Sequence, residues 1–274
     1  MGRAIVAKLL PVLEKMEWNG DEEATRAGQV VFKTAIDQID GFRGDPQVLG
    51  DALRTLRTSD SLPYAYGGVA YLLVTASAED DGNHAGDHDP QGLEAALSWL
   101  ERAQELAPDV TDLNVIEPLI YTFSGRYEDA RLVLDYLHEQ SPHNYFLHRA
   151  EMYYWQHVGD LDEALAWSEQ AMGQAETVPQ RLRLKSAAAT LHLQRGDGDR
   201  ALQTYKEALH FDDENAWLNH QISQLHYDRG ELEEAARFNQ KALKIQSDFA
   251  PARQLREVMT EGERGAGLFG RLFG

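Results

Sequence analysis

Apolar residues recur at helical spacing from the start of the chain. Over 3–17 they share one side of a predicted helix, at Ile5, Leu9, Leu10, Leu13 and Met16. A second amphipathic helix is predicted over 22–39, with Val30, Val31, Ala35 and Ile39 on its buried side. Asp45-Pro46 starts a third helix ending about residue 57, because Asp caps helices well and Pro suits the first helical position.

Farther along the chain, one sequence motif recurs at a nearly fixed interval. Gly-x-x-x-x-Ala occurs as GRYEDA, GDLDEA, GDGDRA and GELEEA, beginning at Gly125, Gly159, Gly196 and Gly230. These glycines lie 34, 37 and 34 residues apart, and the segment 179–181 accounts for the longer interval. Such a period indicates stacked helix–turn–helix units that cannot bury their apolar faces alone. A glycine suits the end of each first helix, where a positive φ is often needed.

Small residues repeat in the same phase. One position holds Ala96, Ala130, Ala164, Ala201 and Ala235, and seven residues later stand Ala103, Leu137, Ala171, Ala208 and Ala242. The pattern resembles the tetratricopeptide repeat (TPR) family, whose unit has about 34 residues. The resemblance covers 61–249 in five units, namely 61–110, 111–144, 145–178, 182–215 and 216–249. It implies an all-α, right-handed α-solenoid of about five TPR-like helix–turn–helix units with N- and C-terminal capping helices.

This phasing divides the chain into four segments. Residues 1–60 form an N-terminal helical cap or divergent helix pair, and 61–249 form the solenoid, interrupted by an insertion loop at 79–91. A C-terminal capping helix is predicted over 250–262 and a flexible tail over 263–274. In the second unit, Pro118 should kink or shorten its helix, because proline lacks an N–H and crowds the preceding turn.

Charge and composition argue against several classes of function. The chain has 45 acidic and 26 basic residues, a net charge of −19 and no cysteine. An acidic surface repels phosphate backbones, so we expect no nucleic-acid partner, and the lack of cysteine excludes disulfides and thiolate chemistry. We find no secretory signal and no membrane-spanning run, which needs about 18 apolar residues, so we expect a cytoplasmic protein without stable membrane insertion.

No motif for catalysis or cofactor binding is present. The sequence has no phosphate loop, nucleotide fingerprint, nucleophile elbow or zinc-protease motif, so we predict no enzyme, no catalytic residue and no cofactor. The insertion EDDGNHAGDHDPQ does hold candidate metal ligands at His84, His88, Asp87 and Asp89. Its acidic and glycine-rich composition is more typical of an exposed, solvated loop, and we favour that interpretation over a metal site.

The concave groove is the candidate binding surface. In the TPR family the first helix of each unit lines it, and the resemblance maps this lining to Tyr66, Leu73, Val115, Leu119, Phe123, Arg149, Tyr153, His157, Arg183, Gln194, Trp217, His220, Gln221, Gln224 and Tyr227. Arg149 and Arg183 would be available for a partner's carboxylate. The apolar N-terminal end of the groove could instead be filled by the N-terminal helices or by self-association. The lysine–asparagine set of carboxylate-binding chaperone adaptors is not reproduced.

The chain closes with GLFGRLFG, a tandem of Leu-Phe pairs at Leu268, Phe269, Leu272 and Phe273. We favour its being a ligand for a protein groove over a weak membrane contact or an inert terminus. The sequence thus predicts a non-catalytic protein–protein interaction scaffold or adaptor that binds a peptide or helix in its groove. The alternative is a self-associating regulatory or assembly subunit, in which groove and tail bind each other between protomers. A metal-dependent enzyme or sensor is a third, less favoured possibility.

Overall fold

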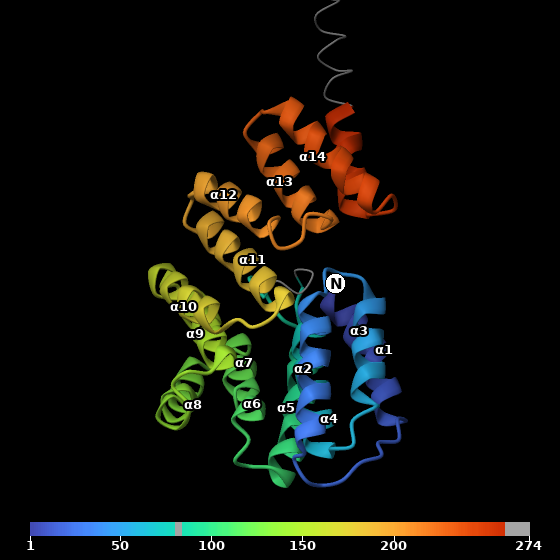
Figure 1. The fold of residues 1–274 in the computed structure, drawn as a ribbon, viewed down its shortest axis with the longest axis vertical. Helices are drawn as coiled ribbons and strands as arrows, with labels where there is room; N and C mark the ends of the chain where they lie inside the picture. Colours follow the sequence, from blue (N-terminus) through green and yellow to red (C-terminus); the bar gives the residue numbers. More distant parts are fainter. Residues whose placement is uncertain (80–83, 261–274) are drawn as a thin grey trace, which may run out of the picture. The chain divides into compact units, whose positions relative to one another are not determined.

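The computed structural model describes residues 1–79 and 84–260, and the described part is built from helices (Figure 1). Its only β contacts are two isolated bridges, Asp21–Ser61 and Ala78–His88. The three N-terminal helices are α1 (Gly2–Glu14), α2 (Arg26–Asp40) and α3 (Pro46–Leu56), close to the three helices predicted there. Asp45 caps α3 as expected, since its side chain accepts a hydrogen bond from the Gln47 N–H.

Helix pairs follow in the predicted phase. They are α4 (Leu62–Ser77) with α5 (Pro90–Leu106), α6 (Thr111–Asn114) and α7 (Ile116–Phe123) with α8 (Tyr127–Gln140), α9 (Tyr145–Val158) with α10 (Leu161–Gln174), α11 (Val178–Gln194) with α12 (Gly198–Ala208), and α13 (Ala216–Asp228) with α14 (Leu232–Ile245). Residues 250–260 are also helical. The all-α solenoid class inferred from the repeat is confirmed.

Two compact units divide the chain, Met1–Leu191 and His192–Gly274, and their boundary falls inside α11. In the first unit α1 and α2 pack on α4, and α2 also packs on α3. In the second unit α13 packs on both α12 and α14. None of the described helices is long and apolar enough to cross a membrane.

The proline in the second repeat shortens its helix, as predicted. The first helix of that repeat is split at Val115 into α6 and α7. Pro118 is the third residue of α7, where its missing N–H costs nothing, whereas a continuous helix would set its ring against the carbonyl of Asn114. The break is therefore placed one turn before the proline.

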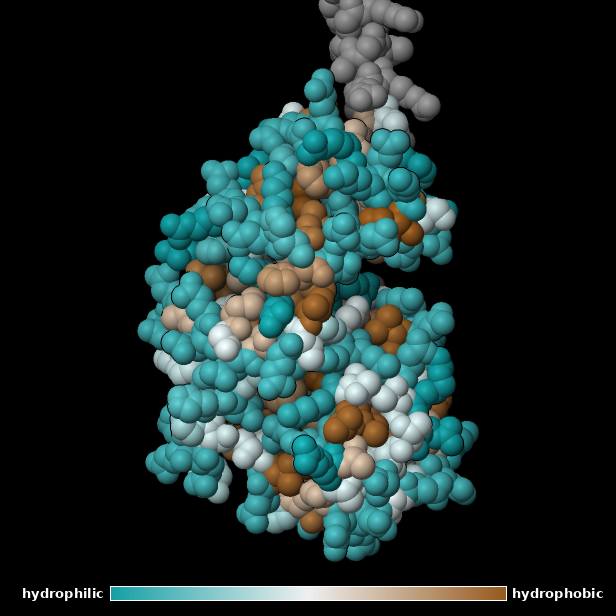
Figure 2. Space-filling model, viewed as in Figure 1, coloured by the Kyte–Doolittle hydropathy of each residue, from teal (hydrophilic) through white to brown (hydrophobic). Residues whose placement is uncertain are grey.

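Small buried residues let paired helices approach. The five repeat alanines Ala96, Ala130, Ala164, Ala201 and Ala235 are all fully buried, as are Ala103, Ala171, Ala208 and Ala242. Polar residues dominate the outside, and the face in Figure 2 is mostly hydrophilic with small hydrophobic patches. This distribution agrees with a strongly acidic chain that buries its apolar side chains in its interior.

The repeat glycines end the first helix of four pairs in a left-handed conformation. Gly125, Gly159, Gly196 and Gly230 have φ values of +72°, +97°, +79° and +75°. At Gly159 the N–H donates to the Trp155 carbonyl, and so does the N–H of Asp160. A Cβ at any of the four would meet no atom within 4 Å, so backbone conformation alone demands glycine there.

Gly159→Ala should lower the free energy of unfolding by about 1–2 kcal/mol, the cost of a left-handed L-residue. Gly173→Ala is the matched control, because Gly173 lies exposed within α10 with open space at its Cβ. Removing a glycine from a helix should stabilise the protein by about 0.5–1 kcal/mol. Urea unfolding followed by circular dichroism measures both, and equal shifts of the same sign would contradict this role for Gly159.

Candidate functional site

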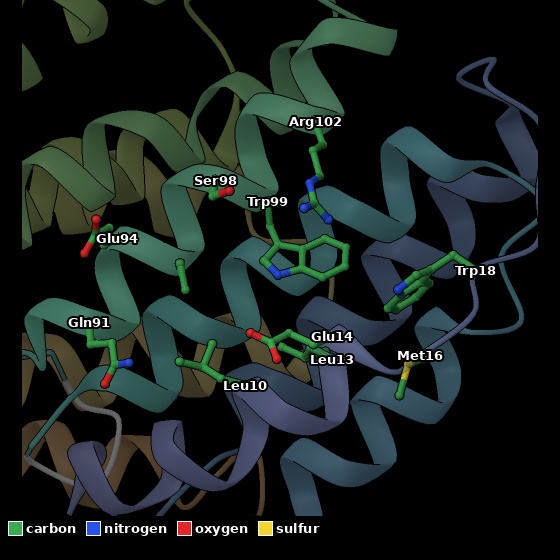
Figure 3. A pocket seen from close by; sticks show the side chains of 11 residues that line it. Leu10, Leu13, Glu14, Met16, Trp18, Gln91, Glu94, Ser98, Trp99 and Arg102 are labelled. Carbon is green, nitrogen blue, oxygen red and sulfur yellow. The ribbon is translucent and has the colours of Figure 1, made fainter.

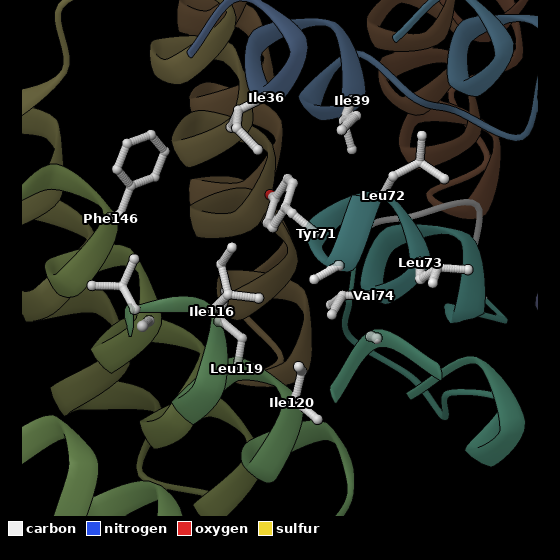
Figure 4. Packing of buried hydrophobic residues seen from close by; sticks show 14 of the residues in the cluster. Ile36, Ile39, Tyr71, Leu72, Leu73, Val74, Ile116, Leu119, Ile120 and Phe146 are labelled. Atoms are coloured by element: carbon white, nitrogen blue, oxygen red, sulfur yellow. The ribbon is translucent and has the colours of Figure 1, made fainter. Parts of the chain in front are cut away.

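Helix α2 lies against the first helices of the first four repeats, through residues of the unit Met1–Leu191. It packs on α4, and Gln29 donates to Asp112 of α6 at 2.8 Å. The Phe32 ring meets Phe146 of α9, with centroids 6.4 Å apart. Figure 4 shows Ile36 and Ile39 directed towards Tyr71 of α4, and Phe146 lies to the left of Ile36 in this view. The N-terminal part of the predicted groove therefore holds a helix of the chain itself.

The apolar groove residues are consequently interior. Leu73, Val115, Leu119 and Tyr153 are each at most 3% exposed, whereas Tyr66, Phe123 and His157 are partly buried. Of the occupants left open by the sequence, the N-terminal helices are the ones that the structure places here. Helix α2 fully buries its own Phe32, Ile36 and Ile39 here, so a partner's helix could take this place only by displacing α2.

The carboxylate of Asp40, the last residue of α2, joins this helix to α9 and α11. Arg149 Nη1 donates to Asp40 Oδ2 at 2.6 Å, and Arg183 Nε lies 3.4 Å from Asp40 Oδ1. The Tyr71 hydroxyl donates to the same Oδ1 at 2.6 Å. All four side chains are at most 2% exposed. We call these four residues the Asp40 cluster.

Charges in the Asp40 cluster depend on each other. Burial alone would lower the pKa of Arg149, but the carboxylate of Asp40, together with smaller effects of Tyr71, Tyr145 and Tyr153, outweighs burial and raises this pKa well above its usual value. Burial raises the pKa of the Tyr71 hydroxyl, opposed by Arg149 and supported by Asp40, so Tyr71 remains a neutral donor. The Arg149 guanidinium also lies 5.1–5.3 Å from the ring centroids of Tyr71, Tyr145 and Phe146.

The expectation that Arg149 and Arg183 are available to a partner's carboxylate is corrected by this geometry. Both guanidinium groups are closed from solvent, and both face the chain's own Asp40. Sequence reasoning missed Asp40 because repeat phasing says nothing about segments before the first repeat. A signal was present, since Asp40 stands four residues after Ile36 and so lies on the apolar face of its helix.

A second contact stabilises the C-terminal end of α2. Thr177, just before α11, donates its hydroxyl to Asp37 Oδ1 at 3.1 Å. Burial raises the pKa of Asp37, the Thr177 hydrogen bond lowers it, and the nearby Asp40 raises it again. Two carboxylates of α2 therefore meet partners from later repeats.

The histidines of the insertion loop are buried, so the prediction of an exposed loop is wrong at His84 and His88. Their rings stack with each other at 5.2 Å, and the His88 ring stacks on Phe123 at 4.1 Å. His84 Nδ1 and His88 Nε2 are 2.9 Å apart, in hydrogen-bond contact. The backbone carbonyl of His84 lies 2.9 Å from His157 Nε2. Apolar burial of these rings outweighs the polarity of the surrounding loop.

The four candidate metal ligands do not converge. Asp89 Oδ2 accepts from the Gly92 N–H and caps α5, whereas Asp87 is exposed. Within residues 1–79 and 84–260, no group of three or more His, Cys, Asp or Glu is placed to hold a metal ion. The pair His84–His88 is engaged with itself and with aromatic neighbours.

In the unit His192–Gly274, the predicted groove residues are more open. Gln194 is exposed, and Gln221, Gln224 and Tyr227 of α13 are partly buried. We call the last three the α13 face. Trp217 and His220 differ: both are buried, Trp217 against Tyr205 and His220 against Phe249. Burial also lowers the pKa of His220. The predicted tail contacts Leu268, Phe269, Leu272 and Phe273 lie outside the described residues.

Asp40→Asn should be strongly destabilising, because it removes the buried carboxylate that pairs with the guanidinium groups of both Arg149 and Arg183. The expected loss is about 3–5 kcal/mol in the free energy of unfolding, measured by urea denaturation. Asp51→Asn is the matched control at a half-exposed position of α3, where a change within about 0.5 kcal/mol is expected. Similar losses in the two variants would show that the Asp40 cluster is not what holds α2.

His84 should make stability fall in acid. Burial lowers its pKa well below 6.5, and four charged or titratable neighbours act in the same direction, Arg183, His88, Arg149 and His157. Below about pH 6.5 the unfolded chain binds a proton that the folded chain does not, so stability decreases by up to about 1.4 kcal/mol per pH unit. Above that pH the penalty is absent.

The variant His84→Asn should flatten this loss, measured as urea unfolding midpoints between about pH 7 and 5. Asparagine tolerates the φ of +61° found at this position. His143→Asn, at an exposed position, should leave the slope unchanged. If the stability of His84→Asn falls with pH as steeply as that of the unaltered protein, His84 is not the cause of the loss.

Comparison with known proteins agrees with the fold. The family model described as tetratricopeptide repeat matches residues 192–258, whereas no curated protein matches the chain. TTC0263, a thermophilic TPR protein of Thermus thermophilus, is 19% identical with a TM-score of 0.48, covering 62% of this chain and 90% of its own.

Two further solved structures share the fold more closely. The pilF protein of Pseudomonas aeruginosa is 13% identical with a TM-score of 0.54, covering 77% of this chain and 92% of its own. A monomeric mutant of IFIT1, solved with m7Gppp-AAAA, is 13% identical with a TM-score of 0.57, covering 79% of this chain and 50% of its own. The match identifies residues 192–258 as tetratricopeptide repeat, and helix pairs recur in the same phase from α4 to α14.

Proposed function

We propose that this protein is a non-catalytic interaction scaffold or adaptor, which binds an extended or helical segment of a protein partner on the α13 face. TPR proteins generally mediate protein–protein interactions, and the family model matches the part of the chain that contains α13. One observation carries the choice of surface. Gln221, Gln224 and Tyr227 remain partly exposed, whereas the predicted groove arginines are engaged by Asp40.

The chemistry of the α13 face suits a peptide backbone. A glutamine amide both donates and accepts hydrogen bonds, as a peptide group does, and a tyrosine adds apolar area with a polar tip. Gln224 Nε2 donates to Asp228 Oδ1 at 2.8 Å, which fixes the amide and leaves its oxygen for a donor. We infer a neutral or basic protein segment as the ligand, since the chain carries a net charge of −19.

A nucleic-acid ligand is disfavoured by the same charge. The likeness to IFIT1, at 13% identity, shows the fold alone. Action in the cytoplasm stays a prediction, as does the absence of catalysis.

The test is affinity capture from a native lysate with the tagged full-length chain, comparing Gln221→Arg/Gln224→Arg with the unaltered protein. Recovery of the partner should fall about 10-fold or more, because two interface residues are replaced by larger, charged ones. The control is Gln203→Arg/Gln240→Arg, which changes two exposed glutamines on α12 and α14. Gln203 bonds Glu207 at 3.1 Å, in the same i,i+4 manner as Gln224 bonds Asp228.

The control variant should retain the partner. Equal recovery with both double variants would exclude the α13 face, and loss with both would point to a general effect of added charge.

A further inference from the structure

A second surface is a pocket between α1 and α5. It has a volume of about 460 Å³. Its apolar lining consists of Leu10, Leu13, Met16, Trp18 and Trp99. Figure 3 shows Trp99 of α5 between Leu13 and Glu14 of α1 on one side and Arg102 on the other. Ligand pockets typically measure about 300–1,000 Å³, so this one could take one or two large side chains.

Two tryptophans, Trp18 and Trp99, line the pocket, and the predicted groove residue Tyr66 packs against both. Trp18, Tyr66 and Trp99 meet edge to face, with centroids 5.4–6.1 Å apart. All three are partly buried and pack on the apolar core of the first unit. Tryptophan and tyrosine held in this way are the residue types that contribute most to binding energy in protein interfaces.

The rim of the pocket is polar and mainly acidic. Glu14 and Glu94 are exposed on α1 and α5. Arg102 is exposed as well, with its guanidinium 4.7 Å from the Trp99 ring centroid. A ligand with apolar anchors and one positive charge would match this arrangement, because its charge could lie near either glutamate while its anchors fill the floor.

We propose that the segment 267–274 of a second copy of this chain occupies the pocket. Its sequence, GLFGRLFG, offers two Leu-Phe pairs and a single charged side chain, Arg271, in a protein that is otherwise strongly acidic. The leucines stand four residues apart, as do the phenylalanines, which is the spacing of anchors on one face of a bound segment. Residues 261–267 separate the last described residue from the first pair and can span about 25 Å, enough to reach a neighbouring molecule.

The assembly uses a surface other than the α13 face, so it does not rest on the proposed adaptor function. Because the contact joins two different surfaces, reciprocal exchange closes a dimer, whereas one-way binding extends a chain of molecules. Either arrangement raises the mass above that of the monomer.

Size-exclusion chromatography with light scattering of the full chain, over a concentration series, tests the assembly. Its mass should rise above 30.8 kDa with concentration. Phe269→Ser/Phe273→Ser should raise the dissociation constant by about 30-fold or more, as loss of aromatic hot spots does. A constant monomer mass for the unaltered chain would overturn the proposal, as would unchanged assembly in the serine variant.

A charge exchange tests the pocket itself. Glu94→Arg should weaken assembly by about 3- to 10-fold, and adding Arg271→Glu to the same chain should restore it. Glu105→Arg is the matched control, an exposed glutamate of the same helix outside the pocket lining, and should have no effect. Equal weakening by Glu94→Arg and Glu105→Arg, or no recovery in the double variant, would overturn the assignment of the segment to this pocket. Partner capture through the α13 face should be the same in all these variants.

Discussion

The ion pairing of Asp40 with Arg149 and Arg183 is the interaction on which the first unit depends. Two guanidinium groups and one carboxylate are removed from water together with the Tyr71 hydroxyl. Each would be costly to bury alone, and both arginines can pair with Asp40 only while α2 lies against α9 and α11. The cluster therefore selects one position of α2, and apolar burial of Phe32, Ile36 and Ile39 supplies most of the stabilisation there.

This arrangement changes what the repeats do. In the first unit their first helices hold a helix of the same chain, in the way that a TPR groove would hold a partner's helix. The surfaces that other molecules can reach therefore lie outside this part of the groove. The α13 face offers amides and a phenol, and the pocket between α1 and α5 offers tryptophans with an acidic rim. The two differ in chemistry, so they suit different ligands.

Local rules account for the elements that the sequence predicted well. The repeat glycines end first helices because a left-handed residue closes each of them, and Pro118 breaks its helix at the position where its ring would clash. Asp45 begins α3 because its side chain satisfies a free N–H. His84 and His88 show the limit of such rules, since loop composition predicted exposure and stacking on Phe123 buried both rings.

The helices, their approximate boundaries and the repeat phase could all be read from the amino-acid sequence, because they follow from spacing, caps and backbone conformation within a few residues. The face of the repeats that is covered is set by tertiary packing alone. That outcome depends on contacts between residues over a hundred positions apart, such as Asp40 with Arg149 and Arg183, and no local pattern encodes which of several acidic side chains will meet a buried arginine. Trp18 and Trp99 also depend on tertiary packing, because they share a pocket only where α1 packs beside α5.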